Sequence, residues 1–399
     1  MSHFQLALLL GMTVALGPLA LDAYLPAFPA IAREFAIPHA DVGLTLSAYV
    51  ATLGMAQLVG GPLSDRYGRR NILFIGLAVF ALASLMIALA DNLSGMIAWR
   101  VVQGVGGAFC AVSVPAIVRD QVGGQEAARL FGLIGLIMFI APAAAPSLGA
   151  LMLALGDWHW IYVFLAAYAF FLAVVLQLAL FPRLKPRPRT TTPVKTLVTN
   201  YVLVLKHHTT MRFVGIQVMC FSSMMLFITH SSFIYQEWFG LSNSTFSILF
   251  AANIGVMAVL NLINRPLLRT ISSVVLLRVQ VIIQFVMLVG LVSVVLLDGP
   301  LWAVAGFIIA AVGCQGGIVP NNMANALEFF PHMGGTAAAM LGASQFTLAG
   351  AISALSSAYG GEALLPITLS MLACSVGAVL LSLGAPAAVA REKAAEQSA

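Results

Sequence analysis

The chain has 399 residues, of which 61% are hydrophobic and only 8% are charged. This amount of apolar surface exceeds what the core of a water-soluble protein can bury, so a soluble globular fold is excluded. The formal net charge of +5 is small for this length and gives no basis for nucleic-acid binding. The composition therefore predicts an all-α integral membrane protein.

A membrane-spanning helix needs about 20 apolar residues. Breaks at charged residues and Gly/Pro clusters divide the chain into twelve such segments: residues 4–29, 42–62, 71–90, 94–118, 128–153, 159–181, 212–236, 244–264, 274–297, 301–325, 334–358 and 363–384. The first segment lacks a preceding basic stretch and is longer than the apolar core of a signal peptide. We therefore expect it to be retained as a spanning helix.

Basic residues gather in alternate connections between these segments. The connections after segments 2, 4, 6 and 8 and the C-terminal tail hold Arg66, Arg69, Arg70, Arg119, Arg129, Arg183, Lys185, Arg187, Arg189, Lys195, Lys206, Arg212, Arg265, Arg269, Arg278, Arg391 and Lys393. The opposite connections hold Arg33 as their single basic residue, with the acids Glu34, Asp41, Asp91, Asp157, Glu237, Asp298 and Glu362. The positive-inside rule places the basic connections in the cytoplasm, so both termini are expected there.

Similar residues recur at a nearly fixed distance along the chain. Asp91 and Asp298 end the third and ninth segments, Pro62 and Pro266 close the second and eighth, and each pair is 204 to 207 residues apart. This offset predicts two six-helix halves related by duplication, a common plan in secondary transporters. We expect the halves at residues 1–181 and 212–385, a linker at 182–211 and a cytoplasmic tail at 386–399.

The linker at residues 182–211 has two parts. The first, PRLKPRPRTTTP, is basic and rich in proline, so it is expected to be extended. The second places apolar residues on one face of a helix: Val194, Leu197, Val198, Tyr201 and Leu205. Such an amphipathic helix is typical of segments that lie on the inner membrane surface, and an ordinary solvated linker is the alternative.

The stretch GGPLSDRYGRR, residues 60–70, lies between segments 2 and 3. A loop that only marks the cytoplasmic side needs arginines, but it needs neither glycines at fixed offsets nor an acid. Glycines permit a tight turn and a close approach of helices, and a carboxylate can bind a helix N-terminus or an arginine. The residues that form this pattern are Gly61, Leu63, Asp65, Arg66, Gly68, Arg69 and Arg70.

This pattern resembles the signature G-x-L-x-D-R-x-G-R-R of the major facilitator superfamily. The resemblance implies twelve transmembrane helices in two pseudo-symmetric six-helix bundles, and a cluster that latches the two halves together when the cavity faces outward. We expect its partners to be Asp120 for the arginines and the segment Gly334–Thr336 for Asp65. The corresponding loop of the second half, NRPLLRTIS, has no acid, so the latch is expected on one side only.

A second pattern, RVVQGVGGA at residues 100–108, lies in segment 4. Arg100 lies roughly 10 Å below the outer end of this segment, at the rise of an α-helix. At that depth an arginine side chain can extend to the membrane interface, which is one interpretation. With Gln103, Gly104 and Gly107, the pattern is similar to the helix-4 motif of the superfamily, and this resemblance implies that Arg100 takes part in proton coupling.

Asp22 is the only carboxylate that we place inside a spanning segment, at a depth similar to that of Arg100. A carboxylate in the apolar part of a membrane is costly, so it either takes up a proton or pairs with a cation. Asp22 could therefore pair with Arg100 and alternate between the two conditions, as proton coupling requires. A static ion pair between two helices is the alternative.

Segment 5 contains GLIGLIMFIAPAAAPSLGA, in which Pro142, Pro146 and Gly149 predict a thin, kinked helix that a neighbour can approach closely. It resembles, in a degenerate form, the helix-5 signature of the superfamily's antiporters; ordinary packing of small residues is the alternative. With YLPAFP at 24–29 and IVRD at 117–120, the chain is similar to the Bcr/CflA group of drug:proton antiporters. This resemblance implies a multi-pass protein of the bacterial inner membrane, which we expect to work as a monomer.

Adaptable apolar and uncharged polar side chains in the segments are candidates for drug contact. They are Tyr24, Tyr49, Met138, Met225, Phe227, His230, Tyr235, Asn253, Gln315 and Phe346. His230 also falls near the repeat equivalent of Asp22, so it is a candidate for proton transfer. A lone histidine in a membrane more often bonds a neighbouring helix, which is the alternative.

Motifs of enzymes are absent from the sequence. It has no phosphate-binding loop, no HExxH and no serine elbow, and its four cysteines lie singly in four segments without metal-ligand spacing. We therefore expect no catalysis, no metal site and no cofactor, with the proton gradient as the source of energy.

These features predict a proton-coupled multidrug exporter that works by alternating access. Its expected partners are small-molecule drugs, protons and membrane lipid. A single titrating acid implies at most one proton per cycle, which favours neutral amphipathic compounds of the phenicol kind as substrates. Proton-coupled uptake of a small nutrient is the second interpretation, and a non-transporting sensor of the same fold is a distant third.

Overall fold

The computed structural model describes residues 3–122, 124–184, 194–330, 333–360, 363–385 and 389. The proline-rich part of the predicted linker at 185–193, Glu362 and most of the predicted tail at 386–399 lie outside the described residues. Within the described residues all regular secondary structure is helical, and twelve helical segments are long and apolar enough to cross a membrane. The predicted all-helical class and number of spans are confirmed.

The helices follow the predicted order, and several extend beyond the predicted ends. The spanning elements are α1 (His3–Asp22) with η1 (Leu25–Ala27) and α2 (Phe28–Phe35), α3 (His39–Tyr67), α4 (Arg69–Ala88), α5 (Leu93–Gln121), α6 (Gly124–Leu155), α7 (His159–Val175) with η2 (Leu176–Leu180) and η3 (Phe181–Arg183), α9 (His208–Ser232) with η4 (Phe233–Trp238), α10 (Asn243–Leu267), α11 (Ser273–Leu296), α12 (Leu301–Gly313) with α13 (Gln315–Leu327), α14 (Gly334–Gly360) and α15 (Leu364–Leu383). One further helix, α8 (Val194–Lys206), lies between the two sets.

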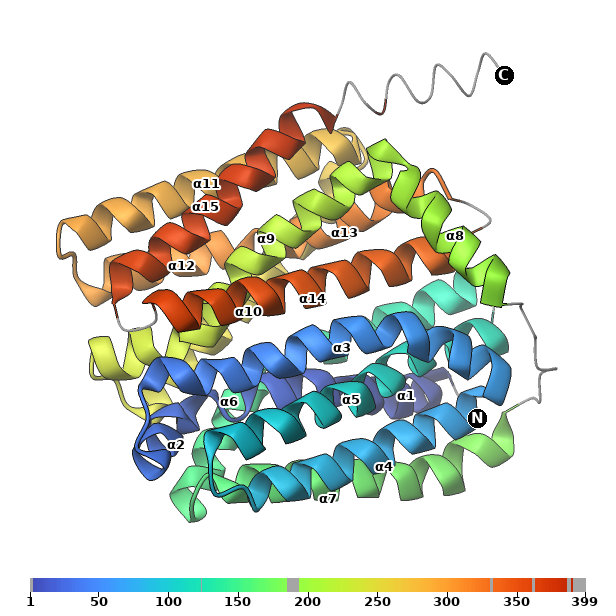
Figure 1. Cartoon of the computed structure of the whole chain (residues 1–399). Coiled ribbons are helices and arrows are strands. Elements are labelled where there is room, and N and C mark those ends of the chain that lie inside the picture. Colours follow the sequence, from blue (N-terminus) through green and yellow to red (C-terminus); the bar gives the residue numbers. More distant parts are fainter. Residues whose placement is uncertain are drawn as a thin grey trace.

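The helices form two bundles that lie side by side (Figure 1). Elements α1 to α7, blue to green, make the first half, and elements α9 to α15, yellow to red, make the second half. Helix α3 of the first half packs along α14 of the second, and α6 packs against α10. The predicted arrangement of two six-helix bundles is confirmed, and these helix pairs form the seam between them.

We name the two ends of the molecule by their charges. The basic end carries Arg66, Arg69, Arg70 and Arg119, and the acidic end carries Glu34, Asp157 and Glu237. Every spanning segment connects one end with the other.

The first span is interrupted near the acidic end. Pro26 and Pro29 follow Asp22, and a proline cannot donate the backbone hydrogen bond that a helix needs. Helix α1 accordingly ends at Asp22, and the chain continues through η1 into α2. Irregular backbone at membrane depth is tolerated where protein buries it, and here Tyr24 and Leu25 are almost fully buried. The interruption therefore places the Asp22 carboxylate at a helix end inside the protein.

Helix α8 lies across the basic end and contacts both halves. Its Val204 is buried against Phe330 and Met340 of the second half, and the Tyr201 hydroxyl donates to the Leu58 carbonyl of the first half at 3.4 Å. Burial and the nearby Asp65 carboxylate raise the pKa of the Tyr201 hydroxyl. The apolar face predicted for this helix is therefore only partly covered by protein. Tyr201 packs on protein, while Val198 and Leu205, which belong to the same predicted face, are exposed.

Candidate functional site

Asp22 is the last residue of α1 and is only 4% exposed. Its Oδ1 atom is buried without a hydrogen-bond partner. No ion pair joins Asp22 to another residue of the described ranges. A buried carboxylate has to be neutralised by a proton or a cation, and no described side chain holds this one in an ion pair.

Arg100 lies on α5 and is fully buried. Its Nη1 donates to the carbonyl oxygen of Ala20 at 3.0 Å and to Oε1 of Gln103 at 2.8 Å, and its Nη2 donates to the hydroxyl oxygen of Tyr162 at 2.8 Å. The side chain therefore does not extend to the membrane interface, and that interpretation of Arg100 is wrong.

Three tyrosine rings surround the Arg100 guanidinium. Its Cζ lies 3.9 Å from the ring centroid of Tyr24, 5.0 Å from that of Tyr162 and 5.5 Å from that of Tyr49. The negative faces of aromatic rings stabilise a cation, and the effect is larger away from water. Tyr24 and Tyr49, which the sequence places among the candidates for drug contact, here contact Arg100.

The ion pair suggested between Asp22 and Arg100 is not formed, and the end of α1 explains why. Because the helix stops at Asp22, the Ala20 carbonyl lacks the partner that the next turn of a helix would supply. This carbonyl also lies at the negative end of the helix dipole. Arg100 binds this free acceptor two residues before Asp22, and the carboxylate is left unpaired.

The helix-4 motif positions Arg100 within this network. Gln103 accepts a hydrogen bond from Arg100, and its Nε2 donates to Oγ of Ser84 on α4 at 2.8 Å. A Cβ at Gly104 would lie 2.7 Å from the Tyr49 carbonyl oxygen, so this glycine allows α3 to approach α5 closely. Gln103 therefore orients the guanidinium, and Gly104 brings the Tyr49 ring within reach of it.

Tyr162 is a part of this site that the sequence analysis does not single out. It lies in the first turn of α7, near the acidic end. Its distance along the sequence from the outer end of its segment places Tyr162 close to the same membrane face as Asp22 and Arg100, and this is the sequence signal that indicates it. Nothing in the sequence shows that the start of α7 comes within reach of the Arg100 side chain, so the hydrogen bond itself is not predictable from spacing.

The motif at residues 60–70 forms the turn between α3 and α4 at the basic end. Gly68 has a φ of +94°, a conformation that glycine adopts without the cost paid by other residues. Arg69 forms an ion pair with Asp65, and its Nε donates to Oδ2 of Asp120 at 3.1 Å. The structure therefore places Asp120 beside the arginines, and these three charged groups all belong to the first half.

The other arginines of the motif lie at its edge. Arg70 donates from Nη2 to Oε1 of Gln177 at 2.8 Å, and the Arg66 guanidinium lies 5.6 Å from the Tyr67 ring centroid. Both contacts are again within the first half.

Two expectations for this motif differ from the structure. A Cβ at Gly61 would meet nothing within 4 Å, so this glycine does not serve a close helix approach. Asp65 pairs with Arg69, and no hydrogen bond among the described residues joins it to Gly334–Thr336. The side chain beside Gly335 is instead Arg119, whose Nη1 lies 3.8 Å from where a Cβ would stand. The contact between the halves at this point therefore comes from an arginine of α5.

The helix-5 motif brings α6 against the interruption of the first span. Pro142 and Pro146 lie inside α6, and a Cβ at Gly149 would overlap the carbonyl oxygen of Ala23. Ala23 directly follows Asp22 in the chain. Gly149 therefore allows α6 to touch the backbone next to the carboxylate.

We expect Gly149→Ala to destabilise the protein by about 1–3 kcal/mol, because a new methyl group would collide with backbone atoms that cannot rotate away. Gly135→Ala in the same helix is the matched control, since nothing lies within 4 Å of its Cβ position. Thermal unfolding of the purified variants in detergent measures the difference. Equal unfolding midpoints for the two variants would contradict this contact.

The remaining candidates for drug contact lie in several places. Phe227 and Tyr235 form an aromatic cluster with Phe246 and Phe250, and the buried side chain of Asn253 lies beside Tyr235. The other candidates lie apart from this cluster. Met138 is partly exposed on α6, Met225 is buried, and Phe346 packs on Phe221. Gln315 donates to the Cys220 carbonyl at 2.6 Å, and Nε2 of His230 lies 3.1 Å from Oγ of Ser356. The structure thus brings these candidates together only in part.

Comparison with known proteins agrees with the fold. The chain is 33% identical over 88% of its length to an uncharacterized MFS-type transporter, YdgK, of Bacillus subtilis, and covers 88% of that protein. It is 27% identical to the bicyclomycin resistance protein homolog of Haemophilus influenzae, over 95% of each chain. The crystal structure of a D-xylose-proton symporter superposes with a TM-score of 0.74 at 14% identity, over 96% of each chain, which indicates a shared fold. Because the model of the Major Facilitator Superfamily matches residues 9–354, the chain belongs to that family of transporters.

Proposed function

We propose that the protein exports small amphipathic drugs in exchange for protons, by alternating access. The observation that carries the proposal is the separation of two buried charges. Arg100 is stabilised by a carbonyl, two side-chain oxygens and three rings, while no described residue forms an ion pair with Asp22. A carboxyl in that position is available to bind and release a proton during the cycle. The name of the Haemophilus influenzae relative supports drugs as the exported compounds.

Proton and drug alternate in the proposed cycle. When the cavity opens outward, a proton neutralises Asp22 and the drug leaves; when the cavity opens inward, the proton leaves and a drug binds. Arg100 keeps its place in both states, because its partners do not include Asp22. Its contact with the Ala20 carbonyl instead holds the end of α1, and so the position of the carboxylate, in the first half.

The basic end faces the cytoplasm in this proposal, with both termini inside and the acidic end toward the outside of the inner membrane. The protein works as a monomer, catalyses no reaction and needs no cofactor. The cluster of Asp65, Arg69 and Asp120 then shapes the cytoplasmic end of the first half.

Drug flux in inverted membrane vesicles tests the direction of transport. An exporter accumulates drug in these vesicles when their interior is acidified, because the former outside is now the lumen. A proton-coupled uptake carrier would move its solute out of the vesicles under the same gradient, and a sensor that does not transport would give no flux. Either of these two results would contradict the proposal.

The membrane potential should affect neutral and cationic drugs differently. With one titrating carboxyl, export of a neutral drug moves one positive charge inward, and export of a monocation moves none. A potential of 100 mV is worth about 2.3 kcal/mol per charge. It should therefore raise the accumulation ratio of a neutral compound about 50-fold and leave that of a monocation unchanged. Proteoliposomes with the pH gradient and the potential imposed separately provide the measurement, and an equal effect on both drugs would refute a single-proton cycle.

A further inference from the structure

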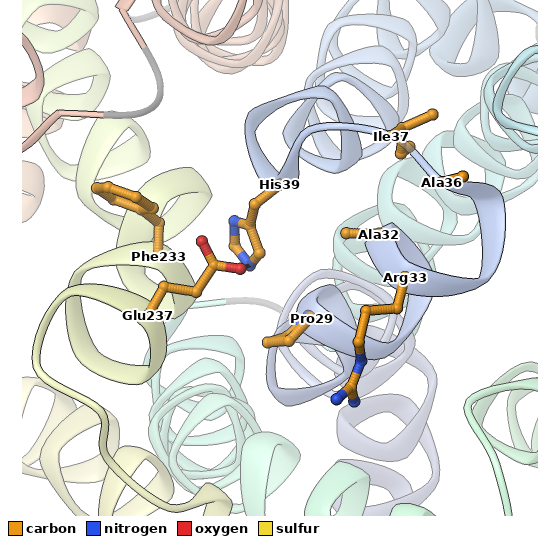
Figure 2. Close-up of a pocket in the computed structure, with 8 residues that line it drawn as sticks. All are labelled: Pro29, Ala32, Arg33, Ala36, Ile37, His39, Phe233 and Glu237. Atoms are coloured by element: carbon orange, nitrogen blue, oxygen red, sulfur yellow. Dashed lines mark ion pairs between the residues drawn. The ribbon is translucent and has the colours of Figure 1, made fainter.

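A contact between the two halves lies at the acidic end, where His39 at the start of α3 faces Glu237 of η4 (Figure 2). Nε2 of His39 lies 3.8 Å from Oε1 of Glu237 and 3.3 Å from Oγ of Ser232 at the end of α9. Among the contacts within 4 Å between a basic or histidine side chain and a carboxylate of the described residues, this one joins the first half to the second. At the basic end, the ion pairs of Arg69 with Asp65 and Asp120 lie within the first half.

Hydrogen bonds extend this contact. The Ser232 hydroxyl donates to Oε1 of Gln236 at 2.5 Å, and Nε2 of Gln236 donates to Oδ1 of Asn243 at 2.6 Å and to the Pro26 carbonyl at 3.4 Å. Because the hydroxyl hydrogen of Ser232 is used by Gln236, the Ser232 oxygen accepts from the Nε2–H of His39. This network thus joins the halves at the acidic end through His39 and through the Pro26 carbonyl.

The local backbone explains how these groups reach the first half. Residues Phe233–Trp238 form a π-helical turn at the end of α9. A π turn is wider than an α turn and changes the direction of the side chains that follow; such turns are frequent at functional sites. In Figure 2, the Glu237 carboxylate from this turn points at the His39 ring.

The contact lies between the outside and the Arg100 site. On its outer side is a cavity of about 560 Å³, whose lining includes Arg33, His39 and Glu237 (Figure 2). On its inner side the fully buried Phe28 ring lies 5.6 Å from His39 and 5.0 Å from Tyr24, which covers Arg100. The side chain of Glu237 is 38% exposed and that of His39 only 5%. Water therefore reaches the outer partner of the contact, and the inner partner is closed off.

We propose that His39, Ser232, Gln236 and Glu237 form the outer gate of this transporter. The gate holds the two halves together while the cavity is closed to the outside. It has to open before a proton from the outside reaches Asp22. That the gate controls proton access to Asp22 rests on the proposed function. That the gate holds the two halves together at the acidic end does not rest on it.

The acidic end offers a matched control for this gate. His159 pairs with Asp157 at 3.0 Å and with Glu34 at 3.5 Å, and all three residues belong to the first half. His159→Gln removes a histidine contact at the same end without touching the seam. His39→Gln removes the imidazole and Glu237→Gln removes the carboxylate charge of the proposed gate, both with little change of volume, and Ser232→Ala is a third variant that removes the hydroxyl between them.

Distances between the halves measure the gate directly. The native cysteines Cys110, Cys220, Cys314 and Cys374 are buried, so cysteines introduced at the exposed Asp91 and Asp298 can be spin-labelled selectively. In lipid nanodiscs without drug or gradient, the gate variants should shift the ratio of long to short label distances about fivefold, the factor expected from one net hydrogen bond. Labels at Arg129 and Arg269 near the basic end should show the opposite change, because the halves then rock together there.

The outcomes separate the gate from the transport proposal. Unchanged distances in His39→Gln and Glu237→Gln overturn the gate, and so does an equal widening in His159→Gln, which would indicate general loosening. The distances are measured without transport, so a widened acidic end supports the gate even if Asp22→Asn still couples drug to protons. In that case the proposed function alone fails.

Discussion

Replacement of Asp22 by asparagine is expected to abolish drug accumulation driven by a pH gradient. One proton per cycle converts each unit of pH difference into about a tenfold drug gradient (about 1.4 kcal/mol). The parent protein should reach this ratio in proteoliposomes with a neutral drug. The variant should remain near unity, because an amide binds no proton and no other described carboxylate lies unpaired beside Arg100.

Exchange without a gradient is the control for this variant. Because asparagine keeps the shape of the side chain, drug-for-drug exchange across the membrane should continue, which shows that the protein is folded and binds its substrate. A variant that still concentrates drug against a gradient would remove Asp22 from the mechanism. Another group, His230 first among the candidates, would then have to carry the proton.

Arg100→Lys should lower the export rate by at least about tenfold although the charge is kept. Lysine cannot reproduce the planar fork with which Arg100 donates to Ala20, Gln103 and Tyr162. A hydrogen bond from a charged group contributes about 1.5–3 kcal/mol, so the loss of one is sufficient for a tenfold effect. The position of α1, and with it Asp22, should become less well defined. Initial rates of drug flux in proteoliposomes provide the measurement.

Tyr162→Phe is the matched comparison for Arg100→Lys. It removes one acceptor of the guanidinium and keeps the ring that lies 5.0 Å from it. Its effect should therefore be smaller than that of the lysine variant. A lysine variant with the parental rate would show that the charge alone matters and that the hydrogen-bonded geometry does not.

Features encoded by neighbouring residues were predictable from the sequence. The number of spans follows from apolar length, and the turn at Gly68 follows from the motif around it. Gln103 could be linked to Arg100 because three residues along a helix place two side chains on the same face. In each case the residues that predict the feature are the same short stretch of chain that forms it.

Features made by distant segments were not predictable. The carbonyl of Ala20, the hydroxyl of Tyr162 and the ring of Tyr24 meet Arg100 only because the fold brings the end of α1, the residues after it and the start of α7 to the Arg100 side chain. Equal depth in the membrane suggested that Asp22 would pair with Arg100, but depth does not show where a helix ends. The end of α1 presents the free Ala20 carbonyl to Arg100, and a single sequence does not show that the guanidinium reaches this oxygen and not the carboxylate.

In the proposed cycle, the uncharged partners of Arg100 determine how the site treats a charged drug. These partners are dipoles and rings, so Arg100 keeps its full positive charge whether or not Asp22 is protonated. The sum of the two side-chain charges is zero while the carboxyl is ionised and becomes +1 when a proton binds. A monocation that is tolerated on the cytoplasmic side is then repelled on the outer side, and a neutral compound experiences no such change. In the proposed cycle, electrostatic repulsion therefore assists the release of cations, whereas the membrane potential assists the export of neutral compounds. A single arginine would then let one carrier serve both.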